Sequence, residues 1–234
     1  MKRVLGIVPA RGGSKGIKNK NIVNLNGKPL ISYTIEVALN AKTLTDVIVS
    51  TDSPVIQRMA IALGAEAPFL RPKELATDTA ESYGVVLHAL EYIEKHNGVE
   101  YDAIVLLQPT TPFRETKLID KAVNTLFATG ADSVISVVDV GASHPIRMYT
   151  IEGDNNLVSF TGNHERSMMP RQSLPSVYIR SGCIYATTRS CIYNQSTLIG
   201  EISKALIVDK KYAINIDDHD DLELARIKMR KQNT

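Results

Sequence analysis

The segment best suited to chemistry is a glycine-rich loop with closely spaced cations, PARGGSKGIKNKN at residues 9–21. Glycines let backbone amides approach a ligand closely, and consecutive amides form a nest for an anion. Arginine and lysine add charge and hydrogen bonds to phosphate oxygens. The loop is therefore predicted to bind a phosphate-bearing ligand. The cations of this region are Arg11, Lys15, Lys18, Lys20 and Lys28.

The spacing of this loop excludes two common nucleotide motifs. It has neither the GxxxxGK[ST] pattern of a Walker loop nor the GxGxxG pattern of nicotinamide-binding loops. The alternative interpretation is a solvated surface turn. The loop follows a short apolar run, residues 4–8, that is typical of a buried parallel strand. Ligands of open parallel sheets bind at the carboxyl ends of the strands, so the position favours binding.

A second polar segment, QPTTPFR at residues 108–114, follows another buried run. Gln108 offers an amide donor and an acceptor, which suit sugar hydroxyls or a base edge. The alternative is that Thr111 and Pro112 only cap the next helix. Both can hold, because capping by Thr111 leaves Gln108 free.

The third segment is INIDDHDD at residues 214–221. Asn215 and Asp217 alternate, so they project from the same side of an extended chain. Such a pair can present oxygens to Mg²⁺, which takes its other ligands from water and substrate phosphates. The alternative is that Asp217 caps a helix whose first turn carries further acidic residues. Taken alone, this segment favours the capping interpretation.

The elements that position these segments alternate along the chain. Such alternation predicts βαβ units and a mostly parallel sheet. The rhythm breaks near residue 140, where turn signals replace helical ones. The expected architecture is one α/β domain over 1–234 with an inserted β-rich arm at about 140–177. The expected strands are 4–8, 47–51, 103–107, 133–138, 178–187 and 206–208, and the expected helices are one from Pro29, 54–63, 78–95, 116–129 and 217–228.

Bulk composition narrows the class of protein. The chain has 234 residues, 44% hydrophobic and 22% charged, which is typical of a globular domain. A net charge of +2 argues against a general nucleic-acid binder. The chain has no apolar run of about 18 residues, so no membrane span is predicted. The amino terminus lacks a signal-peptide pattern. The two cysteines, Cys183 and Cys191, are expected as thiols in a reduced cytoplasmic compartment.

Taken together, the segments resemble the cytidylyltransferases that activate nine-carbon sugar acids, the CMP-N-acylneuraminate synthetases. The resemblance is carried by PARGGSKGIKNKN, VIVSTDS, FLRPKELATDTAES, LLQPTTPFR, RQSLPSVYIRSGCIY and INIDDHDDLELA, and it spans nearly the whole chain. The segment around residues 69–80 also resembles enzymes acting on legionaminic acid. The resemblance implies a Rossmann-like, GT-A-like nucleotidyltransferase fold. It also implies CTP and a nonulosonic acid as substrates, Mg²⁺ as cofactor, and a homodimer whose inserted arms are exchanged.

The resemblance also implies roles for individual residues. Arg11, Lys20 and Asp217 are expected to be catalytic, and Asp217 and Asn215 to hold the metal. The arm, with His144, is expected to reach the sugar carboxylate of a partner subunit. The implied nucleotide-binding residues are Arg11, Gly12, Gly13, Ser14, Lys15, Asn21, Arg71 and Ser82. The implied sugar-binding residues are Gln108, Thr110, Arg147, Arg171 and Tyr178.

Three departures from the family pattern bear on the substrate. Asn215 stands where the family usually has an aspartate, so the amide brings no charge to the metal. Ser181, Gly182 and Cys183, preceded by Arg180, replace the common Asn-Gly-Ala. Arg147 stands where lysine is frequent. The alternatives left open are enzymes for legionaminic acid, pseudaminic acid or keto-deoxyoctulosonate, and a non-catalytic sensor of nucleotide sugars that kept the fold.

Overall fold

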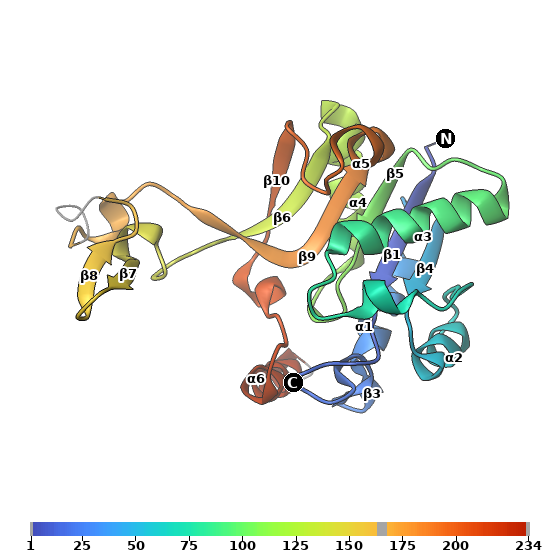
Figure 1. Ribbon diagram of the computed structural model, residues 1–234, viewed down its shortest axis with the longest axis horizontal. Helices are drawn as coiled ribbons and strands as arrows, with labels where there is room; N and C mark the ends of the chain where they lie inside the picture. The colour runs from blue at the N-terminus through green and yellow to red at the C-terminus, as the bar shows by residue number, and fades with distance from the viewer. Residues whose placement is uncertain (1, 163–167, 233–234) are drawn as a thin grey trace.

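The computed structural model describes residues 2–162 and 168–232. Its centre is a six-stranded sheet in the order β10-β6-β9-β5-β1-β4 (Figure 1). Neighbouring pairs β1–β4, β1–β5 and β10–β6 are parallel, which confirms the predicted mostly parallel α/β architecture. The strands of this sheet are β1 (Val4–Pro9), β4 (Asp46–Ser50), β5 (Ala103–Leu106), β6 (Ser133–Asp139), β9 (Tyr178–Thr188) and β10 (Ser203–Ile207).

Helices cover both faces of the sheet, because successive residues of each buried strand point to opposite sides. In β1, Val4 and Val8 pack with α1, α2, α4 and α6 on one face. Leu5 and Ile7 pack with α3 and α5 on the other. The helices are α1 (Leu30–Leu39), α2 (Pro54–Ala62), α3 (Ser82–Asn97), α4 (Thr116–Thr129), α5 (Arg189–Gln195) and α6 (His219–Gln232), with 3-10 turns η1 (Lys20–Ile22), η2 (Lys73–Ala76), η3 (Pro145–Arg147), η4 (Arg171–Ser173) and η5 (Lys210–Ala213).

The long strand β9 is the exception to parallel pairing. It lies between β5 and β6 and runs antiparallel to both. A register shift between Ile135 and Val137 interrupts its ladder with β6, and Gly182 there has a φ of +73°. The bend brings the chain around Gly182 to the end of the sheet where the polar loops lie.

The inserted segment projects from the sheet as a separate arm (Figure 1). The ladder of β6 and β9 continues to its base, where the Val140 amide donates to the Val177 carbonyl at 3.0 Å. Beyond it, β7 (Tyr149–Glu152) and β8 (Asn156–Ser159) form their own two-stranded sheet, as β2 (Asn24–Leu25) and β3 (Lys28–Pro29) do near the amino terminus. Residues 163–167 of the predicted arm lie outside the described part of the chain.

Most predicted elements are present with small shifts at their ends, but one boundary differs where it affects the site. The helix predicted from Asp78 begins at Ser82, so residues 77–81 form a loop instead. The sequence prediction also missed α5 and the antiparallel direction of β9. Within residues 2–162 and 168–232, no helix is long and apolar enough to cross a membrane.

Candidate active site

A cavity of about 520 Å³ lies at the carboxyl ends of β1 and β5. It brings together side chains from all three polar segments, including Lys20 and Asp217, which are 197 residues apart in sequence. Gly12 and Gly13 belong to the glycine loop but do not line this cavity. The predicted site residues that line the cavity are Arg11, Ser14, Lys15, Lys20, Asn21, Arg71, Ser82, Gln108, Thr110 and Asp217.

The carboxylate of Asp78 sits against two cations of the glycine loop. One oxygen lies 2.7 Å from Arg11 Nη2, and the other lies 2.7 Å from Lys15 Nζ. The Lys15 ammonium and then the Arg11 guanidinium lower the pKa of this carboxyl. The two cations thus already hold an anionic group, at the place where the sequence predicts phosphate.

The glycine loop is held in place by contacts with neighbouring segments. The buried Asn21 amide donates to the Arg11 carbonyl at 2.9 Å. The Gly12 amide donates to Asp52 Oδ1 at 2.8 Å, so this amide is engaged within the chain. A Cβ added to Gly16 would lie 2.2 Å from the Asp217 backbone oxygen, which only glycine permits. The loop is therefore preorganised against the segment that carries Asn215 and Asp217.

Arg71 is a buried cation on the cavity wall. It is only 6% exposed, and its Nε lacks a hydrogen-bond partner within the described chain. Burial lowers the pKa of Arg71, a shift that nearby Asp52 opposes and Arg11 reinforces. A buried polar group without a partner is costly, so an acceptor on a ligand would stabilise this side chain.

Asn215 and Asp217 do project together, as the alternation predicts. The Asn215 amide donates to one carboxylate oxygen of Asp217, and Lys20 Nζ lies 2.8 Å from the other. The capping interpretation of Asp217 is wrong, because Asp218 accepts from the Asp221 amide at 2.9 Å at the start of α6. The carboxylate of Asp217 is therefore turned to the cavity rather than to the helix.

The donor set near Asp217 fits a hard cation that keeps most of its ligands from water and phosphate. Asp217 supplies carboxylate oxygens, and the Asn215 side-chain oxygen is a second hard donor beside it. Within the described residues no cluster of three or more His, Cys, Asp or Glu side chains could hold a metal ion unaided. This arrangement suits Mg²⁺ bound jointly with a substrate and does not suit a closed structural site.

Arg114 fixes the second polar segment from beneath. The guanidinium is buried and donates to the carbonyls of Cys183 (2.7 Å) and Gln108 (2.9 Å). It also donates to the hydroxyls of Thr111 (2.8 Å) and Thr34 (3.1 Å), and burial lowers its pKa. The prediction that Thr111 caps the next helix is wrong, because Thr111 turns back to the Gln108 carbonyl and Glu115 precedes α4 instead.

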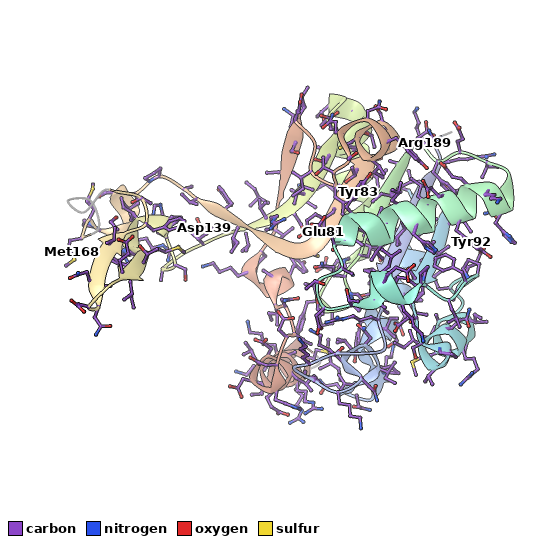
Figure 2. All side chains as sticks on the ribbon, in the orientation of Figure 1. Glu81, Tyr83, Tyr92, Asp139, Met168 and Arg189 are labelled. Carbon is purple, nitrogen blue, oxygen red and sulfur yellow. The ribbon has the colours of Figure 1, made fainter. Side chains whose placement is uncertain are left out.

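A second cavity of about 730 Å³ adjoins the first. The two share Ser82, Leu106 and Gln108 as walls. Gly182 brings the β9 backbone against Gln108, since an added Cβ would lie 2.9 Å from Gln108 Oε1. Glu81 and Tyr83 enter from the start of α3, beside the bend of β9 (Figure 2). Asn215 lines the second cavity and Asp217 the first, so this pair stands at their junction.

The arm residues predicted to bind the sugar lie away from both cavities. Arg171 pairs with Asp139 at 3.2 Å, at the neck of the arm (Figure 2). Arg147 donates to the Met169 carbonyl at 3.1 Å, and Tyr178 is 41% exposed at the start of β9. His144 Nε2 lies 3.1 Å from the Pro175 carbonyl oxygen, within the arm itself. The structure does not bring these side chains to the cavities of their own chain.

Sequence reasoning missed two residues that shape the site. Asp78 lies in the helix predicted over 78–95, although the segment TDTAES carries several polar residues that favour turns and caps. Arg114 received no role, and nothing in its sequence context distinguishes it from a surface arginine. Its burial becomes visible only when α1, β9 and the Gln108 loop meet around it.

Comparison with known sequences gives a consistent family of relatives. Residues 5–164 match the family described as Cytidylyltransferase. The chain is 37% identical to an N-acylneuraminate cytidylyltransferase of Escherichia coli, over 99% of this chain and 53% of that protein. It is 35% identical to a CMP-N,N'-diacetyllegionaminic acid synthase of Legionella pneumophila, covering 92% of this chain and 91% of that protein. It is 33% identical to a pseudaminic acid cytidylyltransferase of Campylobacter jejuni, covering 95% and 94%.

Comparison with solved structures identifies the same fold. The structure of a CMP:2-keto-3-deoxy-manno-octonic acid synthetase complexed with CTP superposes with a TM-score of 0.73. It covers 99% of this chain and 100% of that chain, at 18% sequence identity. The similarity at this level of identity concerns the arrangement of helices and strands.

Proposed function

The chain belongs to the cytidylyltransferase family, and from that premise we propose that it transfers CMP from CTP to a nonulosonic acid. The anomeric hydroxyl of the sugar acid attacks the α-phosphorus of CTP and loses its proton. The bond from that phosphorus to the bridging oxygen breaks, and pyrophosphate leaves with the electron pair. The single observation that carries the proposal is the cation-lined cavity that shares walls with a second, larger cavity.

The glycine loop supports the phosphate half of this reaction. Negative charge grows on the phosphoryl oxygens and on the leaving group, so cations held in place stabilise the transition state. Lys20 is the least exposed of the loop lysines, with 16% of its side chain exposed against 83% for Lys15. Burial strengthens its interaction with a developing charge. We assign Arg11 and Lys15 to the triphosphate, Lys20 to the reacting phosphate, and Arg71 with Ser82 to the cytidine.

Asn215 and Asp217 are the residues that we propose to hold Mg²⁺. When bound, the cation supplies neutralisation of phosphate charge. Asp217 forms an ion pair with Lys20. When the nucleotide and the metal bind, Lys20 exchanges Asp217 for a phosphate, and Asp217 exchanges Lys20 for the metal. This charge compensation takes place at the junction of the two cavities, where CMP is transferred.

The second cavity supports an acylated sugar acid as the acceptor. Gln108 reaches it with an amide, which suits sugar hydroxyls. Part of the wall is apolar, which suits the methyl of an acylamino group. This favours acylated nonulosonic acids over keto-deoxyoctulosonate, which has no acyl group to bury. The aliphatic residues that line this cavity are Leu106, Val138, Ile179, Leu198, Ile199 and Ala213.

We further propose a homodimer in which the arms are exchanged. The arm carries His144, Arg147, Arg171 and Tyr178 away from its own cavities, so they are free to approach those of a second copy. Large apolar side chains of the arm are exposed, which marks an interaction surface. A reduced cytoplasmic compartment is proposed because both buried cysteines, Cys183 and Cys191, are free thiols.

The test is a panel assay of pyrophosphate release from CTP with Mg²⁺. The acceptors are N-acetylneuraminic, legionaminic and pseudaminic acids and keto-deoxyoctulosonate. Turnover with at least one nonulosonic acid is the expected result. Tight CTP binding without turnover on any acid would instead identify a nucleotide sensor and overturn the proposal.

A matched pair of loop variants makes the assay specific to the site. Lys20→Ala is expected to lower kcat by about 100- to 1000-fold, as loss of one preorganised donor does. Lys18→Ala is the control, because this exposed lysine of the same loop does not line the cavity. Equal rates for the two variants would remove Lys20 from the reacting phosphate.

A further inference from the structure

Arg114 is a buried cation that has no carboxylate partner. The residue is only 3% exposed, and no ion pair within residues 2–162 and 168–232 includes it. An arginine keeps its charge inside a protein, and removing that charge from water is costly. Hydrogen bonds must offset this cost, so the partners of the guanidinium show what it stabilises.

Four hydrogen bonds of this guanidinium join three segments that are separate in sequence. Nε donates to the Cys183 carbonyl in β9 at 2.7 Å, and Nη1 donates to the Thr34 hydroxyl in α1 at 3.1 Å. Nη2 donates to the Gln108 carbonyl at 2.9 Å and to the Thr111 hydroxyl at 2.8 Å. Because the guanidinium is planar and rigid, these bonds fix the Gln108 loop relative to β9.

The two carbonyls lie where the Gln108 side chain meets the bend of β9. Cys183 directly follows Gly182, whose φ is +73°. A Cβ added to Gly182 would lie 2.9 Å from Gln108 Oε1, so the side-chain amide rests against the strand backbone. Gln108 lines both cavities, and Gly182 lines the second. A shift of the loop or of the strand would therefore move the Gln108 amide at the junction of the cavities.

The cations on the nucleotide side are held by other contacts. Arg11 and Lys15 pair with Asp78, which belongs to the loop before α3. The four bonds of the buried guanidinium lead instead to α1, the Gln108 loop and β9. Loss of these bonds is thus expected to disturb the acceptor side of the site and to leave the nucleotide side in place.

We propose that Arg114 is a positioning residue for the acceptor: it sets the place of the Gln108 amide relative to β9. The inference rests on the proposed function and adds a residue that acts on the acceptor through Gln108. Charge alone does not perform this role, because the bridge needs several donors in fixed directions. A lysine keeps the charge as a compact ammonium but loses the planar bridge.

The test compares wild type, Arg114→Lys, Gln108→Ala and the double variant. Pyrophosphate release is measured with CTP and the best nonulosonic acid of the panel. Arg114→Lys is expected to raise KM for the acid about 3- to 10-fold, because a displaced amide loses one hydrogen bond to the sugar. The Kd for CTP, measured by isothermal titration, is expected to stay unchanged. Wild-type values of both constants in Arg114→Lys would overturn the inference.

The double variant separates positioning through Gln108 from a general loss of structure. If Arg114 acts through Gln108, its replacement has little further effect once the amide is absent. The rise in KM of the double variant is then expected to match that of Gln108→Ala. Multiplication of the two single effects would show that Arg114 acts independently of Gln108 and would overturn the inference.

A milder variant keeps the inference testable if Arg114→Lys folds poorly. Thr34→Val removes the hydroxyl that accepts from Nη1, at a residue that lines neither cavity. It is expected to raise KM for the acid and to leave the Kd for CTP unchanged. Thr129→Val, near the end of α4, is the matched control and is expected to keep both constants. Lower stability of Thr34→Val in urea with both constants unchanged would make the bridge purely structural and overturn the inference.

Failure of the proposed function would be recognised separately. Absence of pyrophosphate release by wild type with every acid would overturn that function and this inference with it. Turnover by wild type, together with independent effects of Arg114 and Gln108, would overturn only this inference and leave the cytidylyltransferase function intact.

Discussion

At the scale of single residues, the site contains charged groups that already have partners. Asp78 forms ion pairs with Arg11 and Lys15, and Asp217 forms one with Lys20. A triphosphate entering the cavity must replace these carboxylates on the cations. The affinity for the nucleotide therefore depends on the difference in free energy between the ion pairs with the triphosphate and the ion pairs with these carboxylates. Removal of one carboxylate should change this affinity in a definite direction.

Asp78→Asn is expected to tighten CTP binding by up to about tenfold. The amide carries no charge, so it competes less than the carboxylate for the Arg11 and Lys15 cations. Isothermal titration with CTP measures the effect. Asp154→Asn, in the turn between β7 and β8, is the control. Weaker CTP binding by Asp78→Asn would mean that Asp78 orients Arg11 and Lys15 for the triphosphate.

Asn215→Asp is expected to raise the affinity for Mg²⁺ in the presence of CTP. The change adds a negative charge beside Asp217, and a divalent cation favours anionic oxygen ligands. A metal titration followed by thermal stabilisation of the protein gives the apparent affinity without relying on turnover. A marked loss of affinity would show that the donation from the Asn215 amide to Asp217 is what the site requires.

At the scale of elements, the site depends on how closely neighbouring backbones approach. Residues 214–217 are tied to the Gln108 segment, because the Ile216 amide donates to the Thr110 carbonyl at 2.8 Å. The same residues press against Gly16 of the glycine loop. Helix α3 closes the other side, with the loop of Asp78 before it and His88 within it. These contacts link three segments that are distant in sequence into one rigid wall.

Gly16→Ala is expected to lower the free energy of unfolding by about 1–3 kcal/mol, the usual cost of overpacking. The new methyl would meet the Asp217 carbonyl oxygen, so the loop and the metal segment must separate. Gly13→Ala is a matched control for stability, since its Cβ would meet nothing within 4 Å. Urea unfolding of both variants measures the difference. Equal stabilities would show that the loop moves away from Asp217 at little cost.

His88 in α3 should make stability depend on pH. Burial lowers the pKa of His88 below its ordinary 6.5, and the charge of Arg71 lowers it further. The unfolded chain then binds the proton more strongly, so stability is complete above pH 6.5 and is lost as the pH falls through the lower folded-state pKa. His88→Leu should lose less stability than wild type between pH 7.5 and 5.5.

Urea unfolding at several pH values, with a matched histidine, checks this expectation. His96→Leu, at an exposed histidine of the same helix, is expected to follow the wild-type pH profile. If His88→Leu follows that profile too, the acid sensitivity of the protein comes from other groups.

At the scale of the whole molecule, the arm is the feature that a single chain does not explain. Ile151 and Leu157 are direct cross-strand partners of β7 and β8, so they share a face of the hairpin. They are 71% and 63% exposed. Phe160, which directly follows β8, and Met168, which lies at the outer end of the arm (Figure 2), are also exposed. An apolar patch on a projection is expected to be buried against a second copy.

Replacing both Ile151 and Leu157 by glutamate is expected to convert the proposed dimer into a monomer. Four negative charges per dimer at an apolar contact would have to be desolvated. Light scattering after gel filtration measures the molecular mass. Ile61→Glu, at an exposed isoleucine of α2 outside the arm, is the control and should leave the dimer intact. A wild-type monomer, or a dimeric double variant, would contradict arm exchange.

Local sequence patterns predicted the alternation of strands and helices, the position of the glycine loop after the first strand, and an inserted arm at about residues 140–177. These depend on local periodicity and on turn residues, which are visible within a few residues of one another. The glycine loop and the QPTTPFR segment each follow a predicted buried strand, and ligands of open parallel sheets bind at the carboxyl ends of such strands.

Which charged side chains are paired, and which stay exposed, depends on the tertiary structure. Arg114 and Arg180 are both arginines beside site segments, yet one is buried beneath the Gln108 loop and the other is exposed at the second cavity. Asp217 and Asp218 are adjacent, yet one faces Lys20 and the other caps α6. Pairing depends on which groups that are far apart in the chain approach each other in the fold, and the local sequence does not indicate this.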